Sequence, residues 1–87
     1  MRVEQLINNN GNPANNQFII HKNNKQIFQS YETIIAEVKN GVITLDKSAL
    51  DYSKTTSKHL FIFLGKGRKA IEKGLKDKTI KTKNLNR

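Results

Sequence analysis

Lysine side chains recur along one stretch of the sequence at a spacing that suits binding to phosphate groups. At about 100° per residue, a helix through residues 66–78 places four lysines on one side: Lys66, Lys69, Lys73 and Lys76. Ile71 and Leu75 fall on the opposite side, where they would face a core. Cationic side chains on phosphates release condensed counterions, which favours binding. We therefore predict a phosphate-contacting helix, to which Arg68 adds a cation. A lysine-rich face that only contacts solvent is the alternative.

A second anion site is predicted where the preceding helix begins. Four hydroxyl residues lie there, and each can cap a helix: Ser53, Thr55, Thr56 and Ser57. The free backbone amides of a helix start attract anions, and Lys58 and His59 come next in the sequence. A lysine in the first turn opposes the helix dipole, and a bound anion relieves that conflict. The alternative is that Lys58 points to solvent.

The residue inventory argues against catalysis. Two histidines and no cysteine leave neither a conventional zinc site nor a cysteine nucleophile. The seven acidic residues are scattered, without a carboxylate cluster for a metal. Ser53, Ser57 and His59 resemble a nucleophile and its base, but helix capping explains the hydroxyls better. Gly65–Arg68 lacks the spacing of a P-loop, and we interpret it as a helix stop and turn. We predict no enzyme activity, no metal and no cofactor.

The charge of the chain is unevenly distributed. The net charge is +9. Residues 1–52 carry five bases and five acids, whereas residues 53–87 carry eleven bases and only Glu72 and Asp77 as acids. A basic half of this kind favours a polyanionic partner, with nucleic acid ahead of an acidic protein or a membrane surface.

The composition also indicates in which cellular compartment the protein is located. No apolar run approaches the roughly 20 residues of a membrane span, and the first residues lack the apolar stretch of a signal peptide. The absence of cysteine fits a reducing compartment. We expect a soluble protein without a membrane partner, located in the cytoplasm.

Two consecutive hairpins are predicted over residues 17–46, within one domain spanning residues 1–87. Asn23-Asn24 and Asn40-Gly41 can both take the positive φ angles of a two-residue turn. Such turns fix the opposing pairs: Ile20 with Ile27, Ile19 with Phe28, His21 with Gln26, Val38 with Ile43, and Ala36 with Leu45. In the second hairpin one face is then apolar, formed by Ile34, Ala36, Val38, Ile43 and Leu45. A helix over residues 31–39 is the alternative, but three β-branched residues at 33–35 favour the strand.

The other segments are assigned from turn and capping signals. Residues 1–16 form an Asn-rich N-terminal segment, with a short helix over residues 2–8 and then a loop. Residues 53–78 form two helices separated at Gly65. Leu60, Phe63 and Leu64 make the buried seam of the first helix, for which a strand is the alternative. Residues 79–87 are either an edge strand or a loose basic tail.

These segments predict an α+β fold. The sheet is small and antiparallel, with four strands from the two hairpins and a fifth if residues 79–87 add an edge strand. The two helices follow the hairpins in the sequence and pack on one face of the sheet.

The sequence resembles a family of small uncharacterised proteins of bacteriophages and mobile elements. The matching pieces are Asn16-Gln17-Phe18, Phe28-Gln29-Ser30-Tyr31, Ile35-Ala36, Leu45-Asp46, Tyr52-Ser53-Lys54-Thr55-Thr56-Ser57-Lys58-His59, Phe63-Leu64 and Asn84-Leu85-Asn86. They lie across most of residues 16–86, and Leu50 departs from the pattern where an aromatic residue is expected. The resemblance implies phage biology and a host-cell cytoplasm, and it implies no activity.

Three functions remain open. The first is a non-enzymatic protein that binds DNA or RNA through its basic second helix, with Tyr31 or Tyr52 stacking on bases. The second is an anti-defence inhibitor of the anti-CRISPR type, which binds a host nucleic-acid-processing protein. The third is an assembly protein whose exposed hairpin edge joins other copies. The sequence does not predict an oligomeric state.

Overall fold

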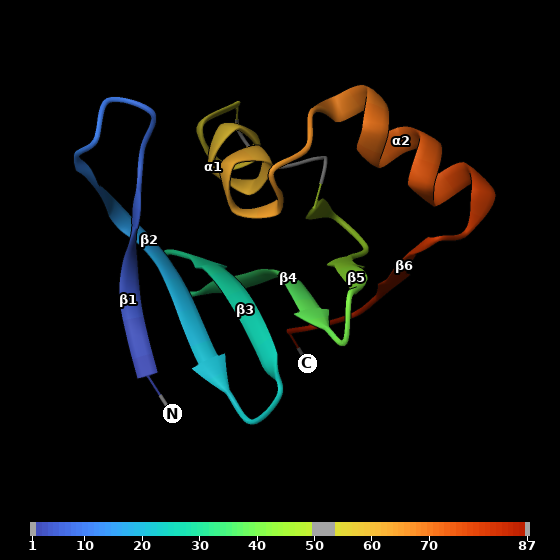
Figure 1. The fold of residues 1–87 in the computed structure, drawn as a ribbon, viewed down its shortest axis with the longest axis horizontal. Coiled ribbons are helices and arrows are strands. Elements are labelled where there is room, and N and C mark those ends of the chain that lie inside the picture. The colour runs from blue at the N-terminus through green and yellow to red at the C-terminus, as the bar shows by residue number, and fades with distance from the viewer. Residues whose placement is uncertain (1, 50–53, 87) are drawn as a thin grey trace.

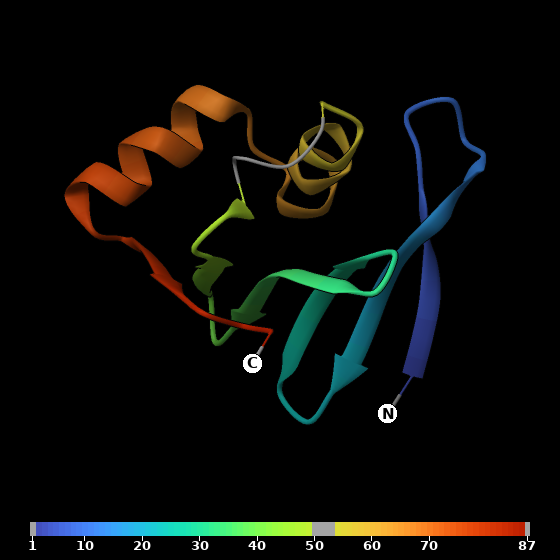
Figure 2. The ribbon, with the colours of Figure 1, turned by 180° about the vertical axis from the view of Figure 1, so that it is seen from behind.

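The computed structural model describes residues 2–49 and 54–86, and in them six strands form one sheet with two helices on one face (Figure 1). In chain order the elements are β1 (Arg2–Ile7), β2 (Pro13–Lys22), β3 (Lys25–Ser30), β4 (Thr33–Lys39), β5 (Val42–Asp46), α1 (Lys54–Leu64), α2 (Arg68–Asp77) and β6 (Ile80–Lys83). The strands follow one another across the sheet in this order, with β1 and β6 at opposite edges (Figure 2). The α+β class is confirmed, in a larger sheet than predicted. We call the face that carries the helices the inner face and the opposite face the outer face.

Both predicted hairpins are present. The β2–β3 and β4–β5 pairs are antiparallel and meet at the two-residue turns. Asn40 and Gly41 have φ angles of 53° and 79°, which asparagine and glycine tolerate better than other residues. Every predicted opposing pair is observed: Ile20–Ile27, Ile19–Phe28, His21–Gln26, Val38–Ile43 and Ala36–Leu45.

The short helix predicted over residues 2–8 is wrong, because this segment is strand β1. It pairs antiparallel with β2, with Val3 opposite Ile20. The predicted loop is also shorter than expected, since β2 begins at Pro13. Within the loop the Asn8 side-chain oxygen accepts hydrogen bonds from the N–H groups of Asn10 (2.9 Å) and Asn12 (3.1 Å). Asparagine thus closes a tight turn between two strands rather than ending a helix.

The prediction of a wholly antiparallel sheet is wrong at its last strand. Residues 80–83 form the edge strand that was one of the two predicted alternatives, and this strand runs parallel to β5. The chain leaves β5, passes through α1 and α2 on the inner face, and re-enters the sheet in the same direction. A parallel pair requires such a long crossover connection, and two helices provide it.

A bulge in β4 changes which isoleucine faces the core. Phe28 lies opposite Ala36 but the next residue, Gln29, lies opposite Ile34. Ile35 is therefore the extra residue, and it is buried at 1% exposure. Because opposing residues share a face, Ile34 lies with Gln29 on the outer face. The predicted inner position of Ile34 is wrong for this reason.

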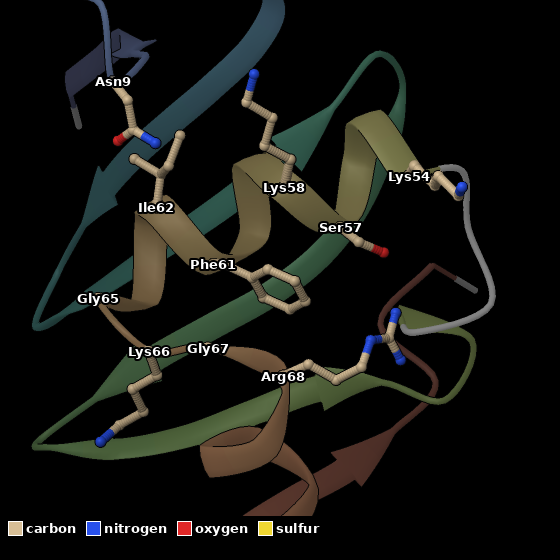
Figure 3. Close-up of a pocket in the computed structure, with 10 residues that line it drawn as sticks. All are labelled: Asn9, Lys54, Ser57, Lys58, Phe61, Ile62, Gly65, Lys66, Gly67 and Arg68. Atoms are coloured by element: carbon tan, nitrogen blue, oxygen red, sulfur yellow. The ribbon is translucent and has the colours of Figure 1, made fainter.

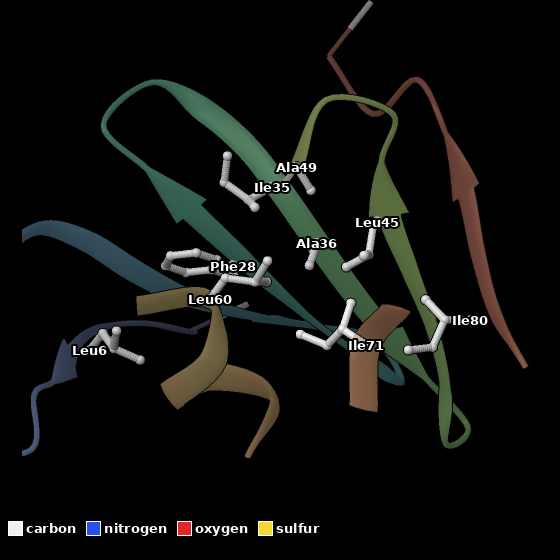
Figure 4. Close-up of a cluster of buried hydrophobic side chains, with 9 residues drawn as sticks. All are labelled: Leu6, Phe28, Ile35, Ala36, Leu45, Ala49, Leu60, Ile71 and Ile80. Atoms are coloured by element: carbon white, nitrogen blue, oxygen red, sulfur yellow. The ribbon is translucent and has the colours of Figure 1, made fainter. Parts of the chain in front are cut away.

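The core lies between the inner face and the two helices (Figure 4). Its buried members are Leu6, Phe28, Ile35, Ala36, Leu45, Ala49, Leu60, Ile71 and Ile80. Leu60 of the predicted α1 seam is fully buried, whereas Phe63 and Leu64 are half-buried and pack against the cluster. The Phe63 ring stacks on Phe28 with centroids 5.5 Å apart. The seam thus holds α1 against β3.

The end of the described chain is anchored rather than loose. The buried Asp46 carboxylate accepts hydrogen bonds from the Leu85 N–H (2.9 Å) and the Asn86 amide (3.1 Å). Asn86 also donates to the Ile34 carbonyl (2.8 Å) and accepts from the Ile34 N–H (2.6 Å). Its carboxamide thereby pairs with the Ile34 peptide groups as a neighbouring strand would.

Candidate anion-binding surface

Three of the predicted lysines share the exposed side of α2. Lys69, Lys73 and Lys76 are all exposed, whereas Ile71 and Gly74 on the opposite side are buried. We call these three lysines the basic stripe. The helical periodicity that predicted the stripe is therefore correct for α2 itself.

Gly74 lets α2 lie close to the sheet edge. A Cβ atom at this position would come within 2.5 Å of the Ile80 Cδ1 atom and 2.6 Å of its Cγ1 atom. Any larger residue would therefore require the Ile80 side chain or α2 itself to shift. The close packing of Gly74 and Ile71 fixes the rotation of the helix, which directs the basic stripe to solvent.

Lys66 does not belong to the stripe, contrary to the prediction. The helix begins at Arg68, two residues later than predicted. Gly65 has a left-handed φ of 68°, and Gly67 is extended at φ −85° and ψ 175°. Lys66 lies between these two glycines, outside both helices. Helical spacing cannot be applied across such a link, which is why the prediction failed here.

Lys66 instead lines a hollow between α1 and the start of α2 (Figure 3). This α1–α2 hollow has a volume of about 760 Å³, and none of the described residues that line it is acidic. Its lining includes four basic residues and two apolar ones: Lys54, Lys58, Lys66, Arg68, Phe61 and Ile62. The arrangement combines positive charge with an apolar wall, which suits a ligand carrying both an anion and a flat apolar part.

The basic side chains around the hollow point in different directions. Figure 3 shows the Arg68 guanidinium and the Lys54 amino group on the same side as the Ser57 hydroxyl. The amino groups of Lys58 and Lys66 extend away from that side. Arg68 also lies over the Phe61 ring, 5.8 Å from its centroid. Arg68 is thus positioned by an aromatic contact beside the hollow.

The predicted anion site at the start of α1 is only partly assembled. Lys58 borders the hollow, but His59 is 8% exposed and already has an interaction partner. The Thr56 hydroxyl is also buried, 3.3 Å from the Ser30 hydroxyl of β3. Ser53 and the side chain of Thr55 lie outside the described part of the structure. The structure therefore does not bring His59 to the basic surface.

The start of α2 has the free amides that the prediction assigned to α1. Its first turn closes with the Ile71 N–H donating to the Gly67 carbonyl (3.1 Å). The preceding N–H groups, from Arg68 to Ala70, have no intrahelical acceptor, and no side chain caps this end. The first turn contains no acid. Because α2 runs away from α1 (Figure 1), this positive helix end faces the hollow.

Two acidic residues lie on α2 beside the basic stripe, and both interact with neighbouring residues. Glu72 lies 3.7 Å from Arg68. Asp77 accepts hydrogen bonds from the Thr79 hydroxyl (2.7 Å) and N–H (3.0 Å) at the other end of α2, which lowers the pKa of this carboxyl. Within residues 2–49 and 54–86, no three histidine, aspartate or glutamate side chains gather to hold a metal. No helix in the described ranges has the length and apolar character needed to cross a membrane.

The family model of DUF8033, a family of unknown function, matches residues 1–82. The chain belongs to DUF8033. No curated protein matches the chain, and no solved structure does so. The DUF8033 match runs from β1 into β6, so it includes both the α1–α2 hollow and the basic stripe.

Several site residues of this DUF8033 chain were not singled out from sequence. Lys54 is one of them: it lies four residues before Lys58, a spacing that places both lysines on one side of α1. Gly65 and Gly67 were interpreted only as a helix stop and a turn, yet they line the hollow. One sequence signal could have pointed to the hollow: the link between the two helices carries basic residues and no acidic residue. Tyr31 is 60% exposed at the β3–β4 turn, and Tyr52 lies outside the described residues.

Proposed function

We propose that this protein binds nucleic acid without catalysing a reaction, through contacts of α2 and the adjacent hollow with phosphate groups. The observation that carries the proposal is the basic stripe beside the hollow, with cations on both and no acid in the first turn of α2. Glu72 pairs with Arg68. Lys73 interacts with the Asp77 carboxyl at the far end of α2, where its charge contributes to the lowered pKa of that group. None of the ion pairs formed by the described residues includes a lysine of the stripe.

The dimensions of α2 fit a short run of phosphates. From Lys69 to Lys76 the helix advances roughly 10 Å, at 1.5 Å per residue. One strand of a duplex advances about 3.4 Å per nucleotide. With α2 aligned along the duplex axis, the basic stripe spans about three nucleotide steps, so its three lysines can each contact a different phosphate. Contacts of this kind position a protein on nucleic acid without reading its sequence.

The first prediction concerns single lysine-to-glutamine changes in the stripe. Lys69→Gln, Lys73→Gln and Lys76→Gln should each weaken binding to a similar extent for all sequences. Each should also make the slope of log affinity against log salt about one unit shallower for a duplex, since one phosphate contact is lost. Fluorescence anisotropy at several salt concentrations measures both quantities.

Lys39→Gln serves as the matched control, because Lys39 is exposed beside the β4–β5 turn. It should leave the salt slope unchanged. The proposal is contradicted if the stripe variants bind like the wild type, or if Lys39→Gln weakens binding equally. If a pull-down from a host lysate then recovers a nucleic-acid-processing protein, the inhibitor hypothesis replaces nucleic-acid binding.

A further inference from the structure

The Ser57 hydroxyl is a buried polar group without a hydrogen-bond partner in the described structure. Ser57 is 5% exposed, and its Oγ atom makes no hydrogen bond. The residue lines the α1–α2 hollow, and Figure 3 shows its hydroxyl on the side where the Arg68 guanidinium lies. A buried hydroxyl without a partner is unfavourable in a folded protein. A ligand oxygen at this side of the hollow would provide the missing partner.

The start of α2 supplies a second, separate reason to expect an anion at this place. Its first N–H groups are free, and the helix dipole places partial positive charge there. Arg68 and Lys69 add two full positive charges to the same turn, which the dipole disfavours. A bound anion would interact favourably with the helix dipole and with both cations, and it would accept hydrogen bonds from the free amides.

The donors around this point suit a terminal phosphate. Hydroxyl, guanidinium and backbone N–H groups can each donate to a different oxygen. A phosphate monoester offers three strong acceptor oxygens and a charge of about −1.5 to −2 at neutral pH, whereas a phosphodiester within a strand carries one charge. Glu72 competes for Arg68, with its Oε2 atom 3.7 Å from the Arg68 Nη1 atom.

The rest of the hollow has the size and character to hold a nucleoside. Its volume of about 760 Å³ lies within the roughly 300–1,000 Å³ of small-molecule sites. Phe61 and Ile62 give it an apolar wall, and bases stack readily on aromatic rings.

We propose that the α1–α2 hollow binds one nucleoside monophosphate, either free or as the phosphorylated end of a strand. Ser57, Arg68 and the first amides of α2 hold the phosphate, and Phe61 and Ile62 contact the base. The inference rests on the proposed function, because it adds an end-recognising subsite beside the basic stripe.

The test compares labelled single strands of one sequence that carry a 5′-phosphate, a 3′-phosphate or only hydroxyl ends. A phosphorylated end should raise affinity about tenfold, as charge-assisted hydrogen bonds are gained. Unlabelled nucleoside monophosphate should compete with that strand, and inorganic phosphate should compete more weakly. Competition by the mononucleotide without a preference for strand ends would identify the free nucleotide as the ligand.

Two variants separate the subsite from the stripe. Ser57→Ala should reduce the preference for a phosphorylated end, measured as the ratio of the affinities for phosphorylated and hydroxyl-ended strands, with thermal melting as the check on folding. Lys76→Gln, at the far end of α2, should weaken all strands equally.

Equal affinity for all three strands, without competition by the mononucleotide, would overturn the subsite. If that binding still depended on salt and on the stripe, the proposed function would stand. Binding of none of the strands would overturn both.

Discussion

Phe28→Ala is expected to lower the free energy of unfolding by about 3–5 kcal/mol, the usual cost of removing a buried phenylalanine. Phe28 is fully buried and lies opposite both Ile19 and Ala36. Its ring also stacks on Phe63 of α1. The truncation would leave a cavity between the sheet and α1, the helix that forms one wall of the hollow. Such a loss is a large part of the roughly 5–15 kcal/mol that stabilises a small domain.

Urea unfolding of the variant and the wild type measures this difference. Phe18→Ala is the matched control, since Phe18 lies in the neighbouring strand opposite Gln29, on the outer face, and is half-buried. Phe18→Ala should lower the free energy of unfolding by clearly less than Phe28→Ala does. If both variants unfolded at the same urea concentration, the core would not lie on the inner face as described.

Asp46→Ala should also destabilise the protein, by about 2–4 kcal/mol, because hydrogen bonds to a buried charged group are worth roughly 1.5–3 kcal/mol each. The Asp46 carboxylate accepts from Leu85, Asn86 and the Ser48 N–H (3.2 Å). Without it, residues 84–86 lose their anchor, and the Ile34 peptide groups lose the Asn86 carboxamide as a partner.

A double-mutant cycle tests this anchor. Asn86→Ala alone should cost less than Asp46→Ala, and the double variant should cost less than the sum, because the two residues share a hydrogen bond. Amide exchange at Ile34 should speed up in every variant. Strictly additive costs with unchanged exchange at Ile34 would contradict the anchor.

The parts of the fold that were predictable are those fixed by adjacent residues. Asn23-Asn24 and Asn40-Gly41 determine two hairpins and their register, because turn geometry alone sets the pairing. Strand β1 was misassigned because Val3, Leu6 and Ile7 fit a helical period as well as a strand. The partner that decides the matter, β2, lies across a loop. The parallel pairing of β6 depends on the path of both helices, and no local pattern contains it.

The candidate site, too, has parts that were predictable from the sequence and parts that were not. Lys69, Lys73 and Lys76 were predictable because they lie within one regular helix. Lys66 was misplaced because the helix starts two residues later than its apolar pattern indicated. Ser57 was interpreted as a helix cap, whereas it is buried inside α1. The hollow itself arises from the angle between two helices, which depends on packing against the sheet.

The most direct test of nucleic-acid binding by this surface is an NMR titration of the ¹⁵N-labelled protein with a short duplex and a short single strand at low salt. The largest amide shift changes should fall in residues 66–76 and along α1 between residues 54 and 62. The turns at residues 23–24 and 40–41 should change little. Shift changes concentrated on the outer face of the sheet, or none with either nucleic acid in excess, would contradict the account.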